Sequence, residues 1–166
     1  MWRWVVLFGS AVLGLARLVA QDTSRFAVLN ALMPTLQGIG TDSNLVRIDR
    51  ALLSSGPTAK PRLVYFLRRY RCEQLYYQGL IAESMIDAER ARRIAESLGD
   101  SLMIASSLNQ IAVLREEQHD DPGAIDLLNS ALRWYPKKAM APYPLTQPHR
   151  IHGNLGAVLG EPGANG

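Results

Sequence analysis

The sequence predicts an all-α protein in which antiparallel helical hairpins stack side by side into a short α-solenoid. Apolar residues recur with helical spacing, short polar or glycine-containing breaks separate them, and no run of alternating β-branched residues predicts a strand. Gly79 and Ala112, like Ala91 and Ala124, are small residues 33 positions apart. A fixed offset of this kind is typical of stacked helical repeats, which bind other molecules through their surface shape.

Residues 1–22 are predicted to form a transmembrane anchor. Trp4 to Val19 is apolar apart from Ser10 and Arg17. A helix from Trp2 onwards would extend roughly 28 Å, close to the ~30 Å hydrocarbon thickness of a bilayer. Trp2 and Trp4 would then lie at the headgroups, and Arg17 is near enough to the other end to reach the interface.

Two other interpretations of this segment remain open. Arg3, the apolar stretch 5–15 and the small residues before Gln21 also resemble a cleaved secretory signal. A buried core helix is the third interpretation. The anchor and the signal both direct the chain to a membrane, and we expect the rest of the chain to lie outside the cytoplasm.

Residues 23–60 are predicted to be a helical connector. Residues 25–33 have a helical composition, and Pro34 begins a linker over 34–43. Asp42 or Ser43 can cap a helix over about 44–53, which the segment 54–57 ends.

Residues 61–166 are predicted to be the repeat domain. Pro61 suits the first turn of a helix that either continues to about residue 84 or bends near Arg71. The further helices are expected at about 72–84, 87–98, 102–117 and 122–134. Asp100 or Ser101 caps the third of these, and Asp121 followed by Pro122 starts the fourth. A proline-rich insert at 136–147 precedes a last helix at about 148–159.

The residues at the matching positions resemble tetratricopeptide repeats over about 72–159. The second unit carries the small and apolar residues of that family at Leu108, Ile111, Ala112, Ala124, Leu128, Ala131 and Pro136. The first unit offers Leu75, Gly79, Ala82, Ala91 and Ala95, and its ending resembles a variant common in bacterial scaffold proteins. Gln78 and Arg115 depart from the family pattern and indicate a degenerate repeat.

The resemblance implies a concave peptide-binding groove lined by the first helix of each unit. The residues that would face it are Glu73, Tyr76, Leu80 and Glu83 in one unit and Ser106, Asn109, Val113 and Glu116 in the next. Their spacing places each set on one side of a helix. The three acids would favour a partner segment with a basic or amide group, although plain solvated faces would show the same pattern.

The formal net charge of +3 is modest, with one basic cluster of Lys60, Arg62, Arg68, Arg69 and Arg71. This cluster is either an attraction for anionic lipid headgroups or an acidic partner, or a solvated helix face. The chain has no recognisable nucleic-acid-binding motif, so we expect no nucleic-acid partner.

The sequence predicts no catalytic residues, no metal site and no cofactor. His149 and His152 have no evident third ligand, and His119 to Asp121 fits a turn and helix cap. Phosphate-binding glycine loops, nucleophile elbows and paired cysteines are absent from the sequence. Cys72, the lone cysteine, is interpreted as a small packing residue.

The function expected from these observations is a noncatalytic, membrane-anchored scaffold, an accessory subunit of a larger membrane protein complex. The last predicted helix has no second helix to pair with, so Leu155, Val158 and Leu159 need a cover from a partner, the inserted loop or further chain. The alternatives are the noncatalytic repeat portion of an envelope enzyme, such as a polysaccharide polymerase or ligase, and a secreted adaptor released by signal cleavage.

Overall fold

The computed structural model describes residues 41–56, 59–135 and 146–160. Within these ranges the protein contains six helices and no strands, as the sequence predicts. The predicted transmembrane anchor, with Trp2, Trp4 and Arg17, lies outside the described residues. None of the helices in the described ranges is both long and apolar enough to cross a membrane.

The helices follow one another at a regular interval. α3 (Pro61–Tyr77), α4 (Ile81–Ser97) and α5 (Ser101–Glu117) each have 17 residues and begin 20 residues apart. α6 (Asp121–Trp134) begins after the same interval. The chain starts this array with α2 (Thr41–Ser55) and ends it with α7 (Pro148–Val158).

The structural repeat of one helical hairpin is therefore 40 residues, and the predicted offset of 33 is wrong. That offset equates Gly79, which lies in the turn after α3, with Ala112, which is buried inside α5. An offset of 40 pairs Gly79 with His119, and both have left-handed backbones, with φ of 74° and 60°. It also pairs the buried Cys72 with Ala112 and the buried Ala91 with Ala131.

The three turns that connect α3, α4, α5 and α6 share one backbone design. After α3, the amide of Gly79 donates to the carbonyl of Tyr76 at 2.9 Å, and the amide of Leu80 donates to the carbonyl of Leu75 at 2.9 Å. This pair of bonds is a Schellman motif, which needs a residue with positive φ at its centre. Gly99 and His119 occupy that central position in the next two turns, with φ of 60° in each case.

These turns correct two predicted helix boundaries. The helices expected at 72–84 and 87–98 are in fact α3, which ends at Tyr77, and α4, which begins at Ile81. The first hairpin turn is thus several residues earlier than predicted, and α3 has no interruption at Arg71. α2 also begins at Thr41, inside the predicted linker. The predictions for α5, α6 and α7 agree with the structure to within one residue at each end.

Capping explains why the first residues of α5 and α6 were predictable. The Asp100 side chain accepts a hydrogen bond from the amide of Met103 at 3.3 Å and caps α5. Asp120 accepts from the amide of Gly123 at 3.1 Å and caps α6, so the cap is one residue before the predicted Asp121. Each bond satisfies an amide that has no partner within its helix.

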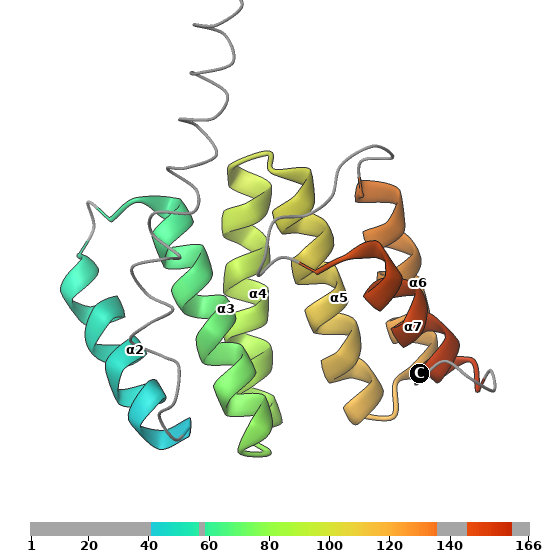
Figure 1. Ribbon diagram of the computed structural model, residues 1–166, viewed down its shortest axis with the longest axis horizontal. Coiled ribbons are helices and arrows are strands. Elements are labelled where there is room, and N and C mark those ends of the chain that lie inside the picture. Colours follow the sequence, from blue (N-terminus) through green and yellow to red (C-terminus); the bar gives the residue numbers. More distant parts are fainter. Residues whose placement is uncertain (1–40, 57–58, 136–145, 161–166) are drawn as a thin grey trace, which may run out of the picture. The chain divides into compact units, whose positions relative to one another are not determined.

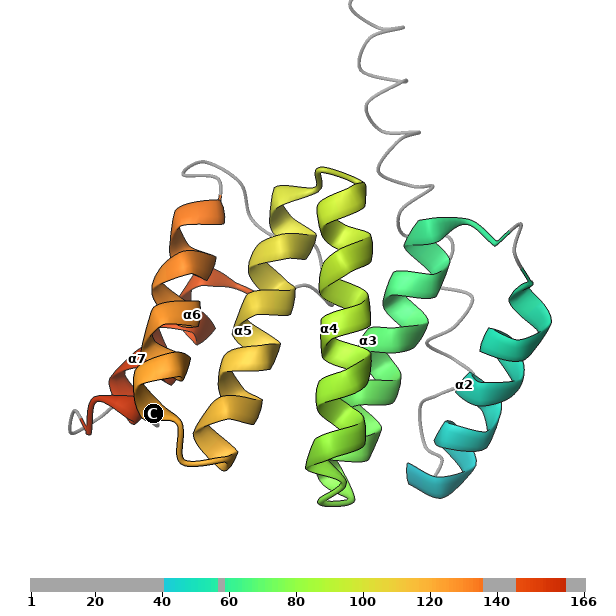
Figure 2. The ribbon, with the colours of Figure 1, turned by 180° about the vertical axis from the view of Figure 1, so that it is seen from behind.

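Each helix packs against the next along the chain, and α5 also contacts α7. In Figure 1, α3 and α7 lie in front of α4 and α6, and the reverse view in Figure 2 places them behind. α3 and α7 therefore lie in one layer and α4 and α6 lie in another, and side chains of α5 contribute to the layer of α3 and α7. This stacking is consistent with an α-solenoid.

Small residues allow the helices to approach closely. Ala88, Ala91, Ala95, Ala124 and Ala131 have no exposed surface. Larger side chains fill the space between them, and Cys72, Ile111 and Leu114 form a core cluster with Ala88. The sequence correctly predicted Ala91, Ala112 and Ala124 as small packing residues. The same prediction for Gly79 is wrong, because Gly79 is exposed in a turn and does not pack against another helix.

Candidate binding site on the layer of α3, α5 and α7

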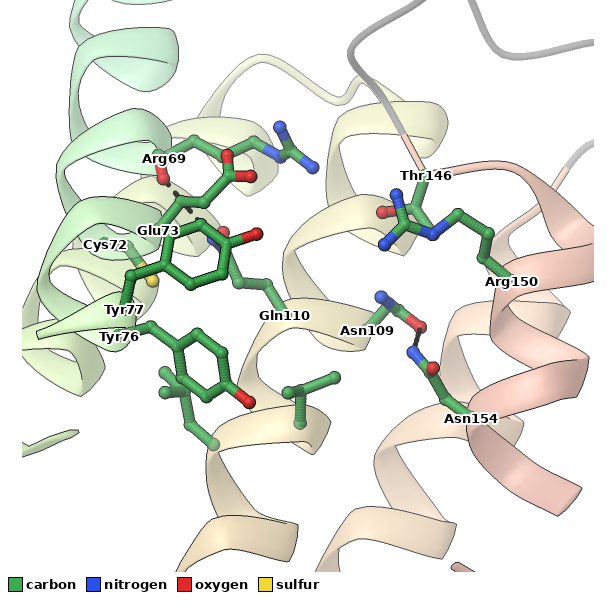
Figure 3. Close-up of a pocket in the computed structure, with 12 residues that line it drawn as sticks. Arg69, Cys72, Glu73, Tyr76, Tyr77, Asn109, Gln110, Thr146, Arg150 and Asn154 are labelled. Atoms are coloured by element: carbon green, nitrogen blue, oxygen red, sulfur yellow. Dashed lines mark hydrogen bonds between the residues drawn. The ribbon is translucent and has the colours of Figure 1, made fainter. Parts of the chain in front are cut away.

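A cavity of about 240 Å³ lies on the layer formed by α3, α5 and α7 (Figure 3). α3 lines it with Arg69, Cys72, Glu73, Tyr76 and Tyr77. α5 contributes Asn109, Gln110, Val113 and Leu114, and the C-terminal part contributes Thr146, Arg150 and Asn154. Residues three or four apart share one side of a helix, so each helix presents a continuous stripe to the cavity.

Hydrogen bonds hold the walls of the cavity together. Asn154 on α7 donates from Nδ2 to Oδ1 of Asn109 on α5 at 2.9 Å. The amide of Thr146 donates to the buried Ser106 hydroxyl at 3.1 Å. On the other side, Gln110 donates from Nε2 to the backbone carbonyl of Arg69 at 3.3 Å. α5 is therefore the floor to which both walls are attached.

Two tyrosines form the aromatic part of the lining. The rings of Tyr76 and Tyr77 meet edge to face, with centroids 5.7 Å apart. The Tyr76 hydroxyl donates to the Glu117 carboxylate at 2.8 Å, and this bond, together with burial, raises the pKa of Tyr76 to about 12. Tyr76 is thus a neutral donor at physiological pH, fixed in orientation by α5.

Cys72 contributes packing to the site and no reactive thiolate. Its side chain is 1% exposed, and burial raises the pKa of the thiol to about 12. The sulfur also lies 3.2 Å from the Ser84 hydroxyl. A thiol that stays protonated at neutral pH is a poor nucleophile. Cys72 is buried in the core cluster with Ala88, Ile111 and Leu114, as expected of a packing residue.

Most arginines of α3 are neutralised inside the fold. Asp87 on α4 has no exposed surface, and its two oxygens accept from Arg68 at 2.7 Å and from Arg71 at 2.5 Å. Arg71 also bonds to Asp49 on α2, at 2.5 Å. Although burial opposes it, the hydrogen bonds to these two carboxylates raise the pKa of Arg71. This ion network joins α2, α3 and α4.

Arg69 differs from its neighbours. Arg62 pairs with Asp100 at 3.3 Å, but the Arg69 side chain has no acidic partner in the part of the chain that the structure describes. Its Nε is buried without a hydrogen-bond partner in these residues. In Figure 3, its guanidinium group and that of Arg150 point from α3 and α7 into the space over α5. The predicted basic cluster is thus divided between internal ion pairs and this cavity.

The structure brings together half of the residues predicted to bind a partner. Glu73, Tyr76, Asn109 and Val113 line the cavity, and Ser106 lies beside it, bonded to Thr146. Of the others, Leu80 is in the turn after α3, Glu83 is exposed on α4, and Glu116 does not line the cavity.

Sequence reasoning missed eight residues of the lining outside the predicted stripes. They are Arg69, Tyr77, Cys72, Gln110, Leu114, Thr146, Arg150 and Asn154. The spacing of Arg69, Glu73 and Tyr77 at i, i+4 and i+8 could have indicated that Arg69 and Tyr77 lie on the same side of α3 as Glu73. The residues of α7 had no comparable signal, because their place in the cavity depends on the packing of α7 against α5.

The predicted apolar end of the array is only partly uncovered. Leu155 and Val158 on α7 are half-buried, while Leu159 directly after it is 52% exposed. His149 and His152 are exposed on the same helix. No group of three metal-ligating side chains occurs in the described residues.

The chain matches no family model, and neither a curated protein nor a solved structure matches it.

Proposed function

We propose that this chain is a noncatalytic scaffold that binds an extended segment of a partner protein in the cavity between α3, α5 and α7. The observation that carries the proposal is the cavity itself, which three helices from successive hairpins line with aromatic, amide and charged side chains. A short solenoid presents such a layer as a continuous surface for an extended chain.

The size and the lining of the cavity favour a segment over a small metabolite. Small-molecule sites usually measure roughly 300–1,000 Å³ and are mostly apolar. This cavity is smaller, at about 240 Å³, and most of the residues that line it are polar. It suits one or two side chains of a longer partner, with the neighbouring helices supplying further contacts.

The proposal extends to the kind of repeat and to the membrane. Stacked hairpins with small residues at their crossings support a degenerate tetratricopeptide-like array, although the 40-residue spacing is longer than the usual 34 of that family. The apolar segment 4–19 supports attachment to a membrane, with membrane protein subunits as partners and the helical domain outside the cytoplasm.

The ion pairs argue against a lipid-binding role for the basic cluster. Arg62, Arg68 and Arg71 are engaged by Asp100, Asp87 and Asp49. Anionic headgroups would have to compete with these internal carboxylates. Arg69 is directed into the cavity, so we assign it to the partner segment.

Site-specific photocrosslinking in native membranes tests the proposal. A diazirine side chain of about the size of leucine would replace Val113, which lines the cavity, or Ile86, which is 51% exposed on α4. We expect position 113 to yield a defined protein adduct and position 86 to yield much less. Equal labelling from both positions, or labelling from position 86 alone, would show that the partner binds elsewhere.

A further inference from the structure

We infer that the segment bound in the cavity presents a carboxylate, which is held between Arg69 of α3 and Arg150 of α7. This inference rests on the proposed function, and it names the chemistry of the partner. The sequence had suggested the opposite preference, for a basic or amide group, because of Glu73, Glu83 and Glu116.

The charges that line the cavity decide between the two preferences. Of the three acids, only Glu73 contributes to the lining, which also contains the two arginines Arg69 and Arg150. No ion pair joins Glu73 to either arginine in the described residues, so the charge of the lining is positive by one. An anionic group therefore gains more from the cavity than a cation does.

The state of Arg69 strengthens this conclusion. Its side chain is half-buried, and its Nε has no hydrogen-bond partner in the described part of the chain. Three neighbouring arginines of the same helix are matched to carboxylates inside the fold. A half-buried charge without a counterion is unfavourable unless something pairs with it, and a ligand carboxylate would supply the missing acceptor.

The surroundings of the two arginines suit a carboxylate. Guanidinium groups bind carboxylates with paired N–H donors. The Asn109 and Asn154 side chains lie between the walls and are fixed to each other at 2.9 Å. Tyr77, 65% exposed at the rim, offers an aromatic surface to residues next to the acid. The carboxylate can come from an aspartate or glutamate side chain or from a chain terminus.

The test uses the full-length chain in mild detergent and four pools of fluorescent peptides about nine residues long. Three pools are blocked at both ends and carry Glu, Gln or Lys at the centre, with random small and apolar residues around it. The fourth carries Gln and a free terminal carboxylate. We expect the wild-type chain to retain the Glu pool, the free-carboxylate pool or both about tenfold better than the blocked Gln pool. Comparing the two acidic pools identifies the source of the carboxylate.

Variants connect this preference to the cavity. Arg69→Gln and Arg150→Gln should each reduce the preference to about twofold or less, and Arg69→Lys should keep part of it. Arg93→Gln is the matched control, because this arginine is exposed on α4 and does not line the cavity. Arg150 is also exposed, so its replacement tests the inference even if Arg69→Gln impairs folding.

The possible results separate the inference from the proposed function. Retention of both acidic pools no better than that of the blocked Gln pool, a preference for Lys, or an unchanged preference in Arg150→Gln would overturn the carboxylate and leave the peptide-binding cavity in place. If the wild-type chain retains no pool, both the inference and the proposed function fail.

Discussion

Replacing Asp87 with asparagine should destabilise the protein by about 3 kcal/mol. The carboxylate has no exposed surface and accepts a hydrogen bond from an arginine on each oxygen. Asparagine keeps the shape but removes the charge, and its amide nitrogen would face one guanidinium N–H. Removing one partner of a buried ion pair costs roughly 3–5 kcal/mol. We expect the lower end of this range, because Arg68 and Arg71 are 24% and 26% exposed and water can partly resolvate them.

Urea unfolding of the full-length chain, followed by circular dichroism in one fixed detergent, measures this loss. The matched control is Glu89→Gln, two residues further along α4. Glu89 pairs with Arg92 at 3.0 Å, but both side chains are about one-third exposed, so its loss should change the free energy of unfolding by less than about 0.5 kcal/mol. A loss below about 1 kcal/mol for Asp87→Asn, or no difference between the two variants, would refute the assignment of Asp87 as the charge that holds α3 against α4.

Two further predictions concern the third turn and the buried thiol. His119→Gly should stabilise the protein by roughly 0.5–1 kcal/mol, because His119 has a φ of 60° that glycine adopts without strain. Urea unfolding measures this gain, and Gly99→Ala, at the same place in the preceding turn, should be destabilising; a gain from both changes would contradict the backbone explanation. Cys72 should resist Ellman's reagent at pH 8 until urea is added, and rapid reaction in the folded protein would contradict its burial. Because the pKa of the folded thiol is raised from 9.0 to about 12, its contribution to stability is complete below pH 9 and is lost as the pH rises towards 12.

The sequence was most informative where a side chain acts on its own backbone neighbours. Asp100 and Asp120 cap α5 and α6 through bonds that span three residues, and Pro148 begins α7. Such signals are local, so the boundaries they mark were predictable to within a residue or so. The end of α3 has no side-chain cap of this kind. Gly79 stands there between helix-compatible residues, and the local pattern does not distinguish a glycine inside a helix from one just after its end.

The binding layer was predictable only in part, for a related physical reason. Helical periodicity placed Glu73 and Tyr76 on one side of α3, and Asn109 and Val113 on one side of α5, and all four line the cavity. Periodicity within one helix says nothing about which other helix faces it. The wall formed by α7 depends on the bond between Asn109 and Asn154, which are 45 residues apart, and on the hydrogen bond of Thr146 to Ser106. These contacts follow from the tertiary packing.

The arginines of α3 show how one helix serves both stability and binding. Arg68 and Arg71 are three residues apart and reach the same buried carboxylate on α4, so they hold the second layer against the first. Arg69 lies between them in sequence, but the helical rotation of about 100° per residue turns it to the other side, where α5 and α7 form the cavity. Internal acids therefore neutralise the charges that face the core, and they leave a positive charge on the layer that we assign to the partner. If this division is correct, loss of Asp87 should reduce stability and leave the preference among peptides unchanged at temperatures where the variant is folded. Arg150→Gln should leave the stability unchanged and reduce the preference for acidic peptides.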